Sequence, residues 1–503
     1  MSNILFDTVL GSPREPDKVC MALPNGDGIT YAQLIEETGR VANALAALGV
    51  KPGDRVAVQV EKSAEVIALY LGAVRAGAVF LPLNTAYTPA EVSYFLEDAR
   101  PSLFVCAPGS PVEASGLAGR LGIAQLTLGQ DGSGTLMDAV RAAVPDFATV
   151  PCSRDDLAAM LYTSGTTGRA KGAMLSHWNL ATNSRTLVDA WRFTSADVLL
   201  HALPIFHTHG LFVATHVALI SGASMLFLPR FDATQVIDLL PRATAMMGVP
   251  TFYTRLLDHG DFTAHVTRHM RVFISGSAPL LAETHRAFQE RTGHAIIERY
   301  GMTETTMNSS NPYDGDRRAG TVGFPLPGIE MRVADPESGA PLPQGEIGVI
   351  EVRGPNVFQG YWQMPEKTAA EFRPDGFFIT GDLGKIDEQG YFHIVGRGKD
   401  LIISGGFNVY PKEIETEIDG MDGVIESAVI GLPHADFGEG VAAVVVTRPD
   451  VQLSEANVQA HLAERLAKFK QPKRVFFVSD LPRNTMGKVQ KNELRARYAD
   501  TFR

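Results

Sequence analysis

The chain has 503 residues, a hydrophobic content of 45% and a formal net charge of -11 at pH 7. That length exceeds one ordinary hydrophobic core, so at least two folding units are expected. An acidic chain lacks the basic surface that binds a nucleic-acid backbone, which excludes nucleic acid as an expected partner. The three cysteines, Cys20, Cys106 and Cys152, are too few and too scattered for a disulfide framework or a zinc site, and they fit buried thiols in a reducing compartment.

Targeting and membrane signals are the next feature along the chain. The first residues have no basic region followed by an apolar core, so no secretion signal is predicted. The most apolar stretch, residues 211–228, contains His216 and Gly222 and is interpreted as a buried helix followed by a strand rather than as a membrane span. Residues 501–503 do not form a peroxisomal signal. We therefore expect a cytoplasmic protein with no membrane partner.

Short β-rich runs alternate with helical patterns through the first half of the chain. A helical pattern covers residues 65–75. The predicted strands of this half span residues 56–60, 78–83, 103–106, 223–228, 245–249 and 272–275. Strand, helix and strand at this spacing favour parallel sheets covered by helices, and hence an α/β fold.

The residue pattern changes twice in the second half of the chain. From about residue 345 alternating strands with turn signals, such as residues 347–352, predict a β-rich subdomain. Glycine and charged residues at 396–400 then precede a segment with its own apolar runs, which favours a separate small α+β core. We place the domain boundary there, with a large domain of residues 1–398 and a small domain of residues 399–503.

A loop of small hydroxylated residues and glycines at residues 162–172 ends in a lysine. Its backbone and side-chain donors suit a phosphate chain, so a triphosphate-binding loop is predicted, with a glycine-rich surface turn as the alternative. It is not a Walker loop, because Ala170 stands where the second glycine would be required. The loop residues assigned to ATP are Thr163, Ser164, Gly165, Thr166, Thr167, Gly168 and Lys171.

Lys488 stands on a proline- and glycine-punctuated loop, residues 482–488, near the C-terminus. Together with the loop at 162–172, this segment resembles the adenylate-forming superfamily, whose members activate a carboxylate with ATP. The resemblance implies that the large domain binds ATP and the acyl substrate and that the small domain is mobile and carries the catalytic lysine. Lys488 would then stabilise charge on the α-phosphate and the attacking carboxylate, whereas any single lysine is otherwise a surface residue.

The resemblance also assigns roles within residues 298–305. Tyr300 would lie against adenine, Thr303 would meet the α-phosphate in the chemical step, and Glu304 would hold Mg²⁺, a hard cation that prefers carboxylate and phosphate oxygens. Thr163 is the second residue expected at the metal. Without the other motifs, this segment would be interpreted as a polar loop after a strand.

Five further residues have expected roles from the same resemblance. Asp382 and Arg397 are expected to hold the ribose, because a carboxylate can accept from both hydroxyls while a guanidinium reinforces the sugar; an aspartate after glycine is otherwise a common turn residue. Lys399 occupies the position of the hinge about which the small domain rotates between adenylation and thioester formation. Gly405 and Gly406 would line the passage for the pantetheine arm of coenzyme A, with a simple turn as the alternative.

The acid is inferred from residues beside these motifs. Arg255 follows an apolar strand and turn expected to approach the acyl site, and a poorly solvated arginine needs an anion, which a second carboxylate on the substrate would supply. An acidic residue on its own helix is the alternative partner, and Arg230 and Arg286 are the other arginines considered. The remaining residues expected in the acyl pocket are His207, also expected in the chemical step, Thr208, Ser277, Met302 and Met307.

Residues 275–280, 298–305 and 308–313 resemble the malonyl-CoA synthetase family, and the likeness extends over essentially the full chain. The resemblance implies that malonate and ATP give malonyl-adenylate and pyrophosphate, and that coenzyme A then gives malonyl-CoA and AMP, with methylmalonate as a second acid. The alternatives are a ligase for another short acid, an adenylation domain serving a carrier protein, a luciferase-like oxygenase, and a nucleotide-binding regulator without turnover. A protein acetyltransferase acting on Lys488 would remove the charge that adenylation needs.

Overall fold

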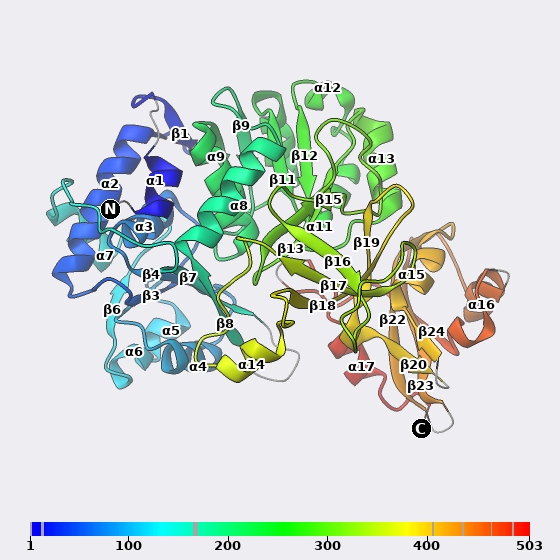
Figure 1. Ribbon diagram of the computed structural model, residues 1–503. Helices are drawn as coiled ribbons and strands as arrows, with labels where there is room; N and C mark the ends of the chain where they lie inside the picture. The colour runs from blue at the N-terminus through cyan, green and yellow to red at the C-terminus, as the bar shows by residue number, and fades with distance from the viewer. Residues whose placement is uncertain are drawn as a thin grey trace.

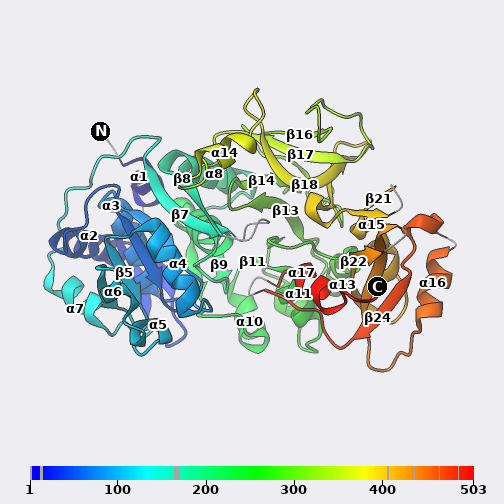
Figure 2. The same ribbon diagram turned by 90° about the horizontal axis from the view of Figure 1, so that it is seen from below.

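The computed structural model describes residues 3–11, 15–163, 170–404, 407–434, 437–463, 465–484 and 487–502. The described residues form four β-sheets with helices packed against them, so the predicted α/β class is confirmed (Figure 1). Figure 2 shows the small C-terminal domain, in orange and red, against one side of the large domain.

A six-stranded sheet with the order β6-β5-β3-β4-β7-β8 forms the N-terminal part of the large domain. β3 to β7 run parallel, and β8 is antiparallel to β7. The strands are β3 Arg55–Gln59, β4 Val79–Pro82, β5 Leu103–Cys106, β6 Ala124–Thr127, β7 Leu157–Thr163 and β8 Lys171–Ser176. The helices are α1 Ile4–Leu10, α2 Tyr31–Ala47, α3 Ala64–Arg75, α4 Pro89–Ala99, α5 Pro111–Ala114, α6 Leu117–Arg120 and α7 Thr135–Ala142. The strands and helix predicted here lie within a residue or two of the observed ones.

A nine-stranded sheet with the order β15-β14-β13-β12-β11-β9-β10-β1-β2 forms the second half of the large domain. Its strands are β1 Val19–Ala22, β2 Gly28–Thr30, β9 Val198–His201, β10 Ser224–Phe227, β11 Ala245–Gly248, β12 Val272–Ser275, β13 Ile297–Met302, β14 Thr306–Ser310 and β15 Phe324–Pro325. The helices are α8 His177–Ala190, the π-helix η1 His209–Thr215, α9 His216–Ser221, α10 Ala233–Leu239, the 3₁₀ helix η2 Leu240–Arg242, α11 Pro250–Leu257, α12 Ala264–Thr267 and α13 Ala282–Thr292. β9 to β13 are parallel neighbours, so their carboxyl ends meet at one edge, where open α/β sheets bind ligands.

The apolar stretch at residues 211–228 forms η1, α9 and β10, as the predicted helix and strand require. Its first turns are π-helical, which the sequence did not predict. The Gly210 carbonyl accepts hydrogen bonds from the Thr215 hydroxyl at 2.9 Å and from His201 Nε2 at 3.0 Å, and these bonds hold the turn wide. Among the described residues, every helix falls short of the length and apolarity needed to cross a membrane.

The predicted β-rich subdomain is a four-stranded antiparallel sheet in the order β16-β17-β18-β19. Its elements are β16 Glu330–Ala334, β17 Gly348–Arg353, α14 Pro365–Ala370, β18 Phe378–Ile386 and β19 Phe392–Arg397. The 3₁₀ helix η3 Gly398–Asp400 follows β19 directly and contains the boundary proposed from the sequence.

The small domain has a five-stranded sheet with two hydrophobic clusters of its own. Its elements are β20 Ile402–Ser404, β21 Phe407–Val409, α15 Pro411–Asp419, β22 Val424–His434, β23 Gly438–Thr447, α16 Glu455–Ala463, the 3₁₀ helix η4 Lys468–Lys470, β24 Arg474–Val478 and α17 Lys491–Arg497. All three cysteines, Cys20, Cys106 and Cys152, lie in the large domain as free, buried thiols.

Candidate active site

The predicted triphosphate-binding loop joins two antiparallel strands. Thr163 ends β7 and is paired with Lys171, the first residue of β8. Ser164, Gly165, Thr166, Thr167 and Gly168 lie outside the described residues. The two ends of the loop therefore stand at the carboxyl edge of the six-stranded sheet.

Lys171 is buried and is held by residues that the sequence analysis did not identify. Its Nζ lies 3.2 Å from Glu371 Oε1 and 3.9 Å from the centre of the Tyr361 ring. The Tyr361 hydroxyl lies 2.7 Å from Glu371 Oε2 and 3.1 Å from Glu304 Oε1. Since a phenol has one proton, it donates to one of these carboxylates at a time. This network joins the lysine of the loop to Glu304, the residue expected at the metal.

Glu304 is buried, and burial raises the pKa of its carboxyl group. No group of three or more His, Cys, Asp and Glu side chains suited to a metal gathers in the part of the chain that the structure describes. A site with the single carboxylate of Glu304 fits Mg²⁺, because this ion is usually bound by one or two carboxylates together with substrate phosphates and water. Thr163 is half-buried at the neighbouring edge of β7.

Asp382 and Arg397, the expected ribose pair, are direct cross-strand partners on β18 and β19. Arg397 Nε lies 2.6 Å from Asp382 Oδ1, and the Asp382 carboxylate raises the pKa of Arg397. The hydroxyl of Tyr300, which is buried at the end of β13, donates to Asp382 Oδ2 at 2.6 Å. Three of the residues assigned to the nucleoside are therefore in contact.

Lys488 comes from the small domain and joins this cluster. Dense surroundings lower the pKa of Lys488 to about 8, and the positive charge of Arg397 adds to the effect, while Asp382 opposes it. The Lys488 side chain nevertheless remains accessible to solvent. Lys399, the expected hinge residue, is exposed, and Gly405 and Gly406 lie outside the described residues.

Arg299, on β13, is a buried cation that forms no ion pair with a described residue. Its Nε and Nη2 have no hydrogen-bond partner among the described residues. A Cβ atom on Gly276 would lie only 2.2 Å from Arg299 Cζ, so the loop after β12 approaches the guanidinium closely because it has no side chain there. Burial lowers the pKa of Arg299 to about 9, which leaves it charged near pH 7. An uncompensated buried charge is strongly unfavourable, so this guanidinium is suited to bind an anion.

Two histidines surround Arg299. Burial, followed by the charge of Arg299, lowers the pKa of His207 to about 4 and that of His209 well below its usual value, so both rings are neutral near pH 7. Ser277 Oγ lies 3.2 Å from His209 Nδ1, and the His209 amide donates to His207 Nδ1 at 3.3 Å. Ser277 has a φ of 71°, a left-handed conformation that is unusual for serine and typical of functional sites. This group of side chains therefore combines one cation with neutral hydrogen-bonding groups.

The other residues expected around the acid have varied surroundings. Thr208 is buried, and its hydroxyl has no hydrogen-bond partner among the described residues. Met307 is buried in β14, while Met302 and Thr303 are half-buried at the end of β13 and just after it.

Arg255 lies on α11 and is exposed. None of the ion pairs between described residues includes it, so the acid on its own helix that the sequence left open is not its partner. Arg286 is also exposed. Arg299 escaped the sequence analysis because it stands inside a motif that was interpreted for nucleotide binding; an arginine in an otherwise buried strand pattern was the available signal.

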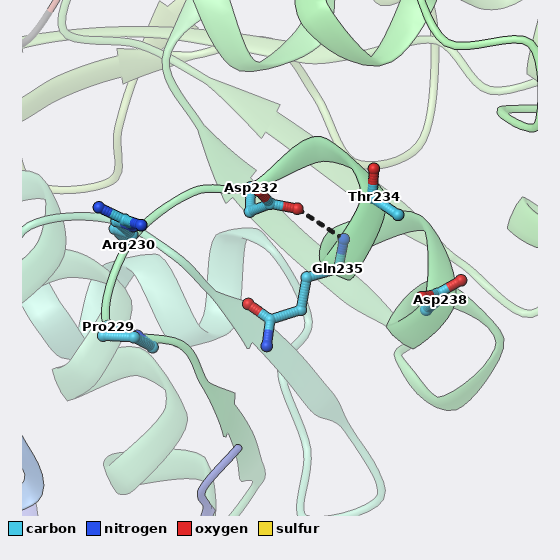
Figure 3. A pocket seen from close by; sticks show the side chains of 6 residues that line it. All are labelled: Pro229, Arg230, Asp232, Thr234, Gln235 and Asp238. Atoms are coloured by element: carbon cyan, nitrogen blue, oxygen red, sulfur yellow. Dashed lines mark hydrogen bonds between the residues drawn. The ribbon is translucent and has the colours of Figure 1, made fainter. Parts of the chain in front are cut away.

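Arg230 is exposed and lines a surface cavity of about 430 Å³ before α10 (Figure 3). Asp232 on the same rim accepts a hydrogen bond from the Gln235 amide at 2.9 Å and so caps the helix. No other predicted site residue lines this cavity.

A buried lysine between the two sheets of the large domain was also missed. The three N–H donors of Lys62 match three acceptors, namely His201 Nδ1 at 2.9 Å, the His201 carbonyl at 2.9 Å and the Leu203 carbonyl at 3.0 Å. Lys62 follows β3 in one sheet, and His201 ends β9 in the other. The contact therefore joins the carboxyl edges of the two sheets.

Comparisons with known proteins indicate one enzyme family for both parts of the chain. Residues 11–362 match the family described as AMP-binding enzyme, and residues 413–488 match the AMP-binding enzyme C-terminal domain. The feruloyl-CoA synthase of Amycolatopsis sp is 37% identical over 94% of both chains, and the malonate–CoA ligase of Arabidopsis thaliana is 34% identical over 89% of this chain and 78% of that one. MatB from Rhodopseudomonas palustris is 62% identical in sequence over 100% of both chains. Its ATP-bound crystal structure matches this one with a TM-score of 0.98, and its apo crystal structure matches with a TM-score of 0.87.

Proposed function

We propose that this chain, which belongs to the AMP-binding enzyme family and is an acyl-CoA ligase of the adenylate-forming superfamily, uses malonate as its acid. The observation that supports malonate is Arg299, a buried and charged guanidinium whose Nε and Nη2 have no partner among the described residues. A carboxylate can accept from both donors, whereas a monocarboxylic acid with its single carboxylate at the reacting end would leave Arg299 without an anion.

The neighbours of Arg299 favour the same class of acid. Because His207 and His209 are neutral, they do not repel a cation and can hydrogen-bond a polar substrate, as can Ser277. Arg255 remains a second candidate for the distal carboxylate. Sequence identity alone does not separate malonate from larger acids, since the feruloyl-CoA synthase is at least as similar as the malonate–CoA ligase.

In the first half-reaction a malonate carboxylate oxygen attacks the α-phosphorus of ATP, a phosphorus–oxygen bond forms and pyrophosphate leaves. We assign the phosphate chain to the loop at 163–171, the ribose to Asp382 and Arg397, and adenine to Tyr300. Lys488 would stabilise the charge that develops on the α-phosphate, with Thr303 and His207 beside the reacting groups. Mg²⁺ held at Glu304 and Thr163 would neutralise charge on the phosphates.

In the second half-reaction the thiol of coenzyme A attacks the acyl carbon of malonyl-adenylate, a carbon–sulfur bond forms and AMP leaves. We propose that the small domain rotates about Lys399 between the two steps, so that Lys488 withdraws and the passage at Gly405 and Gly406 takes its place. The higher TM-score with ATP-bound MatB than with its apo form supports an arrangement suited to adenylation in this structure.

The test is AMP formation that depends on coenzyme A, measured with acetate, butyrate, malonate, methylmalonate, succinate and ferulate. We expect activity with malonate and methylmalonate only. Arg299→Met should lower kcat/KM for malonate at least about a hundredfold, because it removes a desolvated charge pair, and Arg255→Met run in parallel shows which arginine faces the acid. Preference for a monocarboxylic acid would contradict malonate and leave the ligase assignment in place.

A further inference from the structure

The loop that carries Lys488 is closed by hydrogen bonds of its own. The amide of Asn484 donates to the Lys488 carbonyl at 2.9 Å, and the Lys488 amide donates to Asn484 Oδ1 at 2.9 Å. The Gln490 amide donates to the Pro482 carbonyl at 2.8 Å. Lys488 thus sits on a compact hairpin, and its place depends on how this hairpin is fixed to the rest of the small domain.

Arg483 links the hairpin to the small-domain sheet. Its Nη1 donates to the Gly487 carbonyl at 2.6 Å, while its Nη2 forms an ion pair with Glu426 on β22. Both side chains are largely shielded, with 26% and 18% of their surface exposed. The guanidinium reaches the two acceptors from two separate nitrogens in a fixed plane, whereas a lysine would have to reach both from one nitrogen.

A second ion pair holds the far end of the hairpin. Lys491, the first residue of α17, lies 2.5 Å from Glu415 Oε1 on α15. The same oxygen accepts from the Val429 amide of β22 at 2.9 Å. The hairpin is therefore fixed to the small domain on both sides of Lys488.

Arg483 itself stays away from the reacting groups. Among the described residues it contacts Gly487 and Glu426, both in the small domain, whereas Lys488 is influenced by the charges of Asp382 and Arg397 in the large domain. Gly487 also lies against α11, since a Cβ atom there would come within 3.0 Å of the Thr251 side chain. A displacement of Gly487 would therefore also displace Lys488, the next residue in the chain.

We propose that Arg483, held by Glu426, is a positioning residue for Lys488 in the adenylation half-reaction. The guanidinium of Arg483 fixes the Gly487 carbonyl and hence the direction from which Lys488 reaches the α-phosphate. A displacement of about 1 Å in such a group is worth about a hundredfold in rate. The thioester half-reaction does not use Lys488, so it should not depend on Arg483. This inference rests on the proposed role of Lys488 and not on the identity of the acid.

The test measures the two half-reactions separately, as pyrophosphate release from ATP with the preferred acid and as thioester formation from supplied acyl-adenylate. Arg483→Met should lower kcat of adenylation about 30- to 100-fold with little change in KM for ATP or acid, and leave thioester formation within about twofold. Arg483→Lys should restore little of the rate, because one ammonium nitrogen would replace the two guanidinium nitrogens that contact the Gly487 carbonyl and Glu426. Glu426→Gln, which keeps an acceptor, should have a smaller effect.

Two further variants make the result decisive. Arg448→Met removes an exposed ion pair with Asp422 in the same domain, at 2.9 Å, and should leave both half-reactions unchanged. Lys488→Ala should abolish adenylation and spare thioester formation. Normal adenylation in Arg483→Met beside a defective Lys488→Ala, or an equal loss in both half-reactions of Arg483→Met, overturns the inference. Normal adenylation in Lys488→Ala would overturn the role of Lys488 itself.

Discussion

At the scale of single residues, the charges that matter are those with unusual surroundings. Arg299 has no anionic partner in the described part of the chain, while Asp382 and Arg397 compensate one another. Lys488 lies between these cases, because burial first and the charge of Arg397 second lower its pKa to about 8, while Asp382 opposes the shift. The large domain therefore contributes to the electrostatic state of the lysine through Arg397 and Asp382.

The lowered pKa of Lys488 makes a prediction about pH. The ammonium is charged below pH about 8 and loses its proton above it, so kcat/KM for adenylation should fall as pH rises through about 8. Lys488→Arg, which keeps its charge, should shift that fall to higher pH at a lower rate. The measurement is the pH profile of each half-reaction; the same alkaline fall in thioester formation from supplied adenylate would contradict the assignment.

Acetylation of Lys488 would remove the same charge without a change of pH. The exposed part of its side chain is compatible with the proposed protein acetyltransferase. The expected consequence is loss of adenylation with thioester formation kept.

At the scale of elements, the sequence predicted what local patterns determine. The apolar runs at 103–106 and 272–275 became β5 and β12 with the predicted bounds, because buried parallel strands are apolar on both faces. The widened turn of η1 was not predictable, since it depends on a bond between Gly210 and His201 of another element.

The other contacts that the sequence did not predict join residues far apart in the chain. The motifs identified Asp382, Arg397 and Lys171, but nothing near Lys171 in the sequence indicates Glu371. Arg299 was missed because its burial is a property of the packed sheet rather than of its neighbours in the chain. The roles assigned to these residues remain predictions.

The contact between Lys62 and His201, which joins the two sheets, leads to a prediction about the stability of the large domain. Lys62→Met keeps the volume but leaves three buried acceptors with fewer donors, so the free energy of unfolding of the large domain should fall by about 1–3 kcal/mol. The measurement is the urea midpoint, with the exposed Lys51→Met as the control. An unchanged or higher midpoint would mean that desolvation of Lys62 outweighs its three hydrogen bonds.

At the scale of the whole molecule, the site is assembled from parts that fold around separate cores. The large domain supplies Arg299, Lys171 and the Asp382–Arg397 pair, and the small domain supplies Lys488 from a sheet with its own hydrophobic clusters. This arrangement is compatible with the proposed rotation of the small domain between two half-reactions, because that domain would keep its own core.

The central claim is that a second carboxylate on the acid pairs with Arg299. The most direct measurement compares kcat/KM for malonate and monomethyl malonate, which differ in the charge of the distal group, in the wild type and in Arg299→Met. The account predicts that the wild type prefers malonate at least about a hundredfold, or about 3 kcal/mol, and that the variant loses this preference. Equal use of both acids by the wild type, or an unchanged preference in the variant, would contradict it.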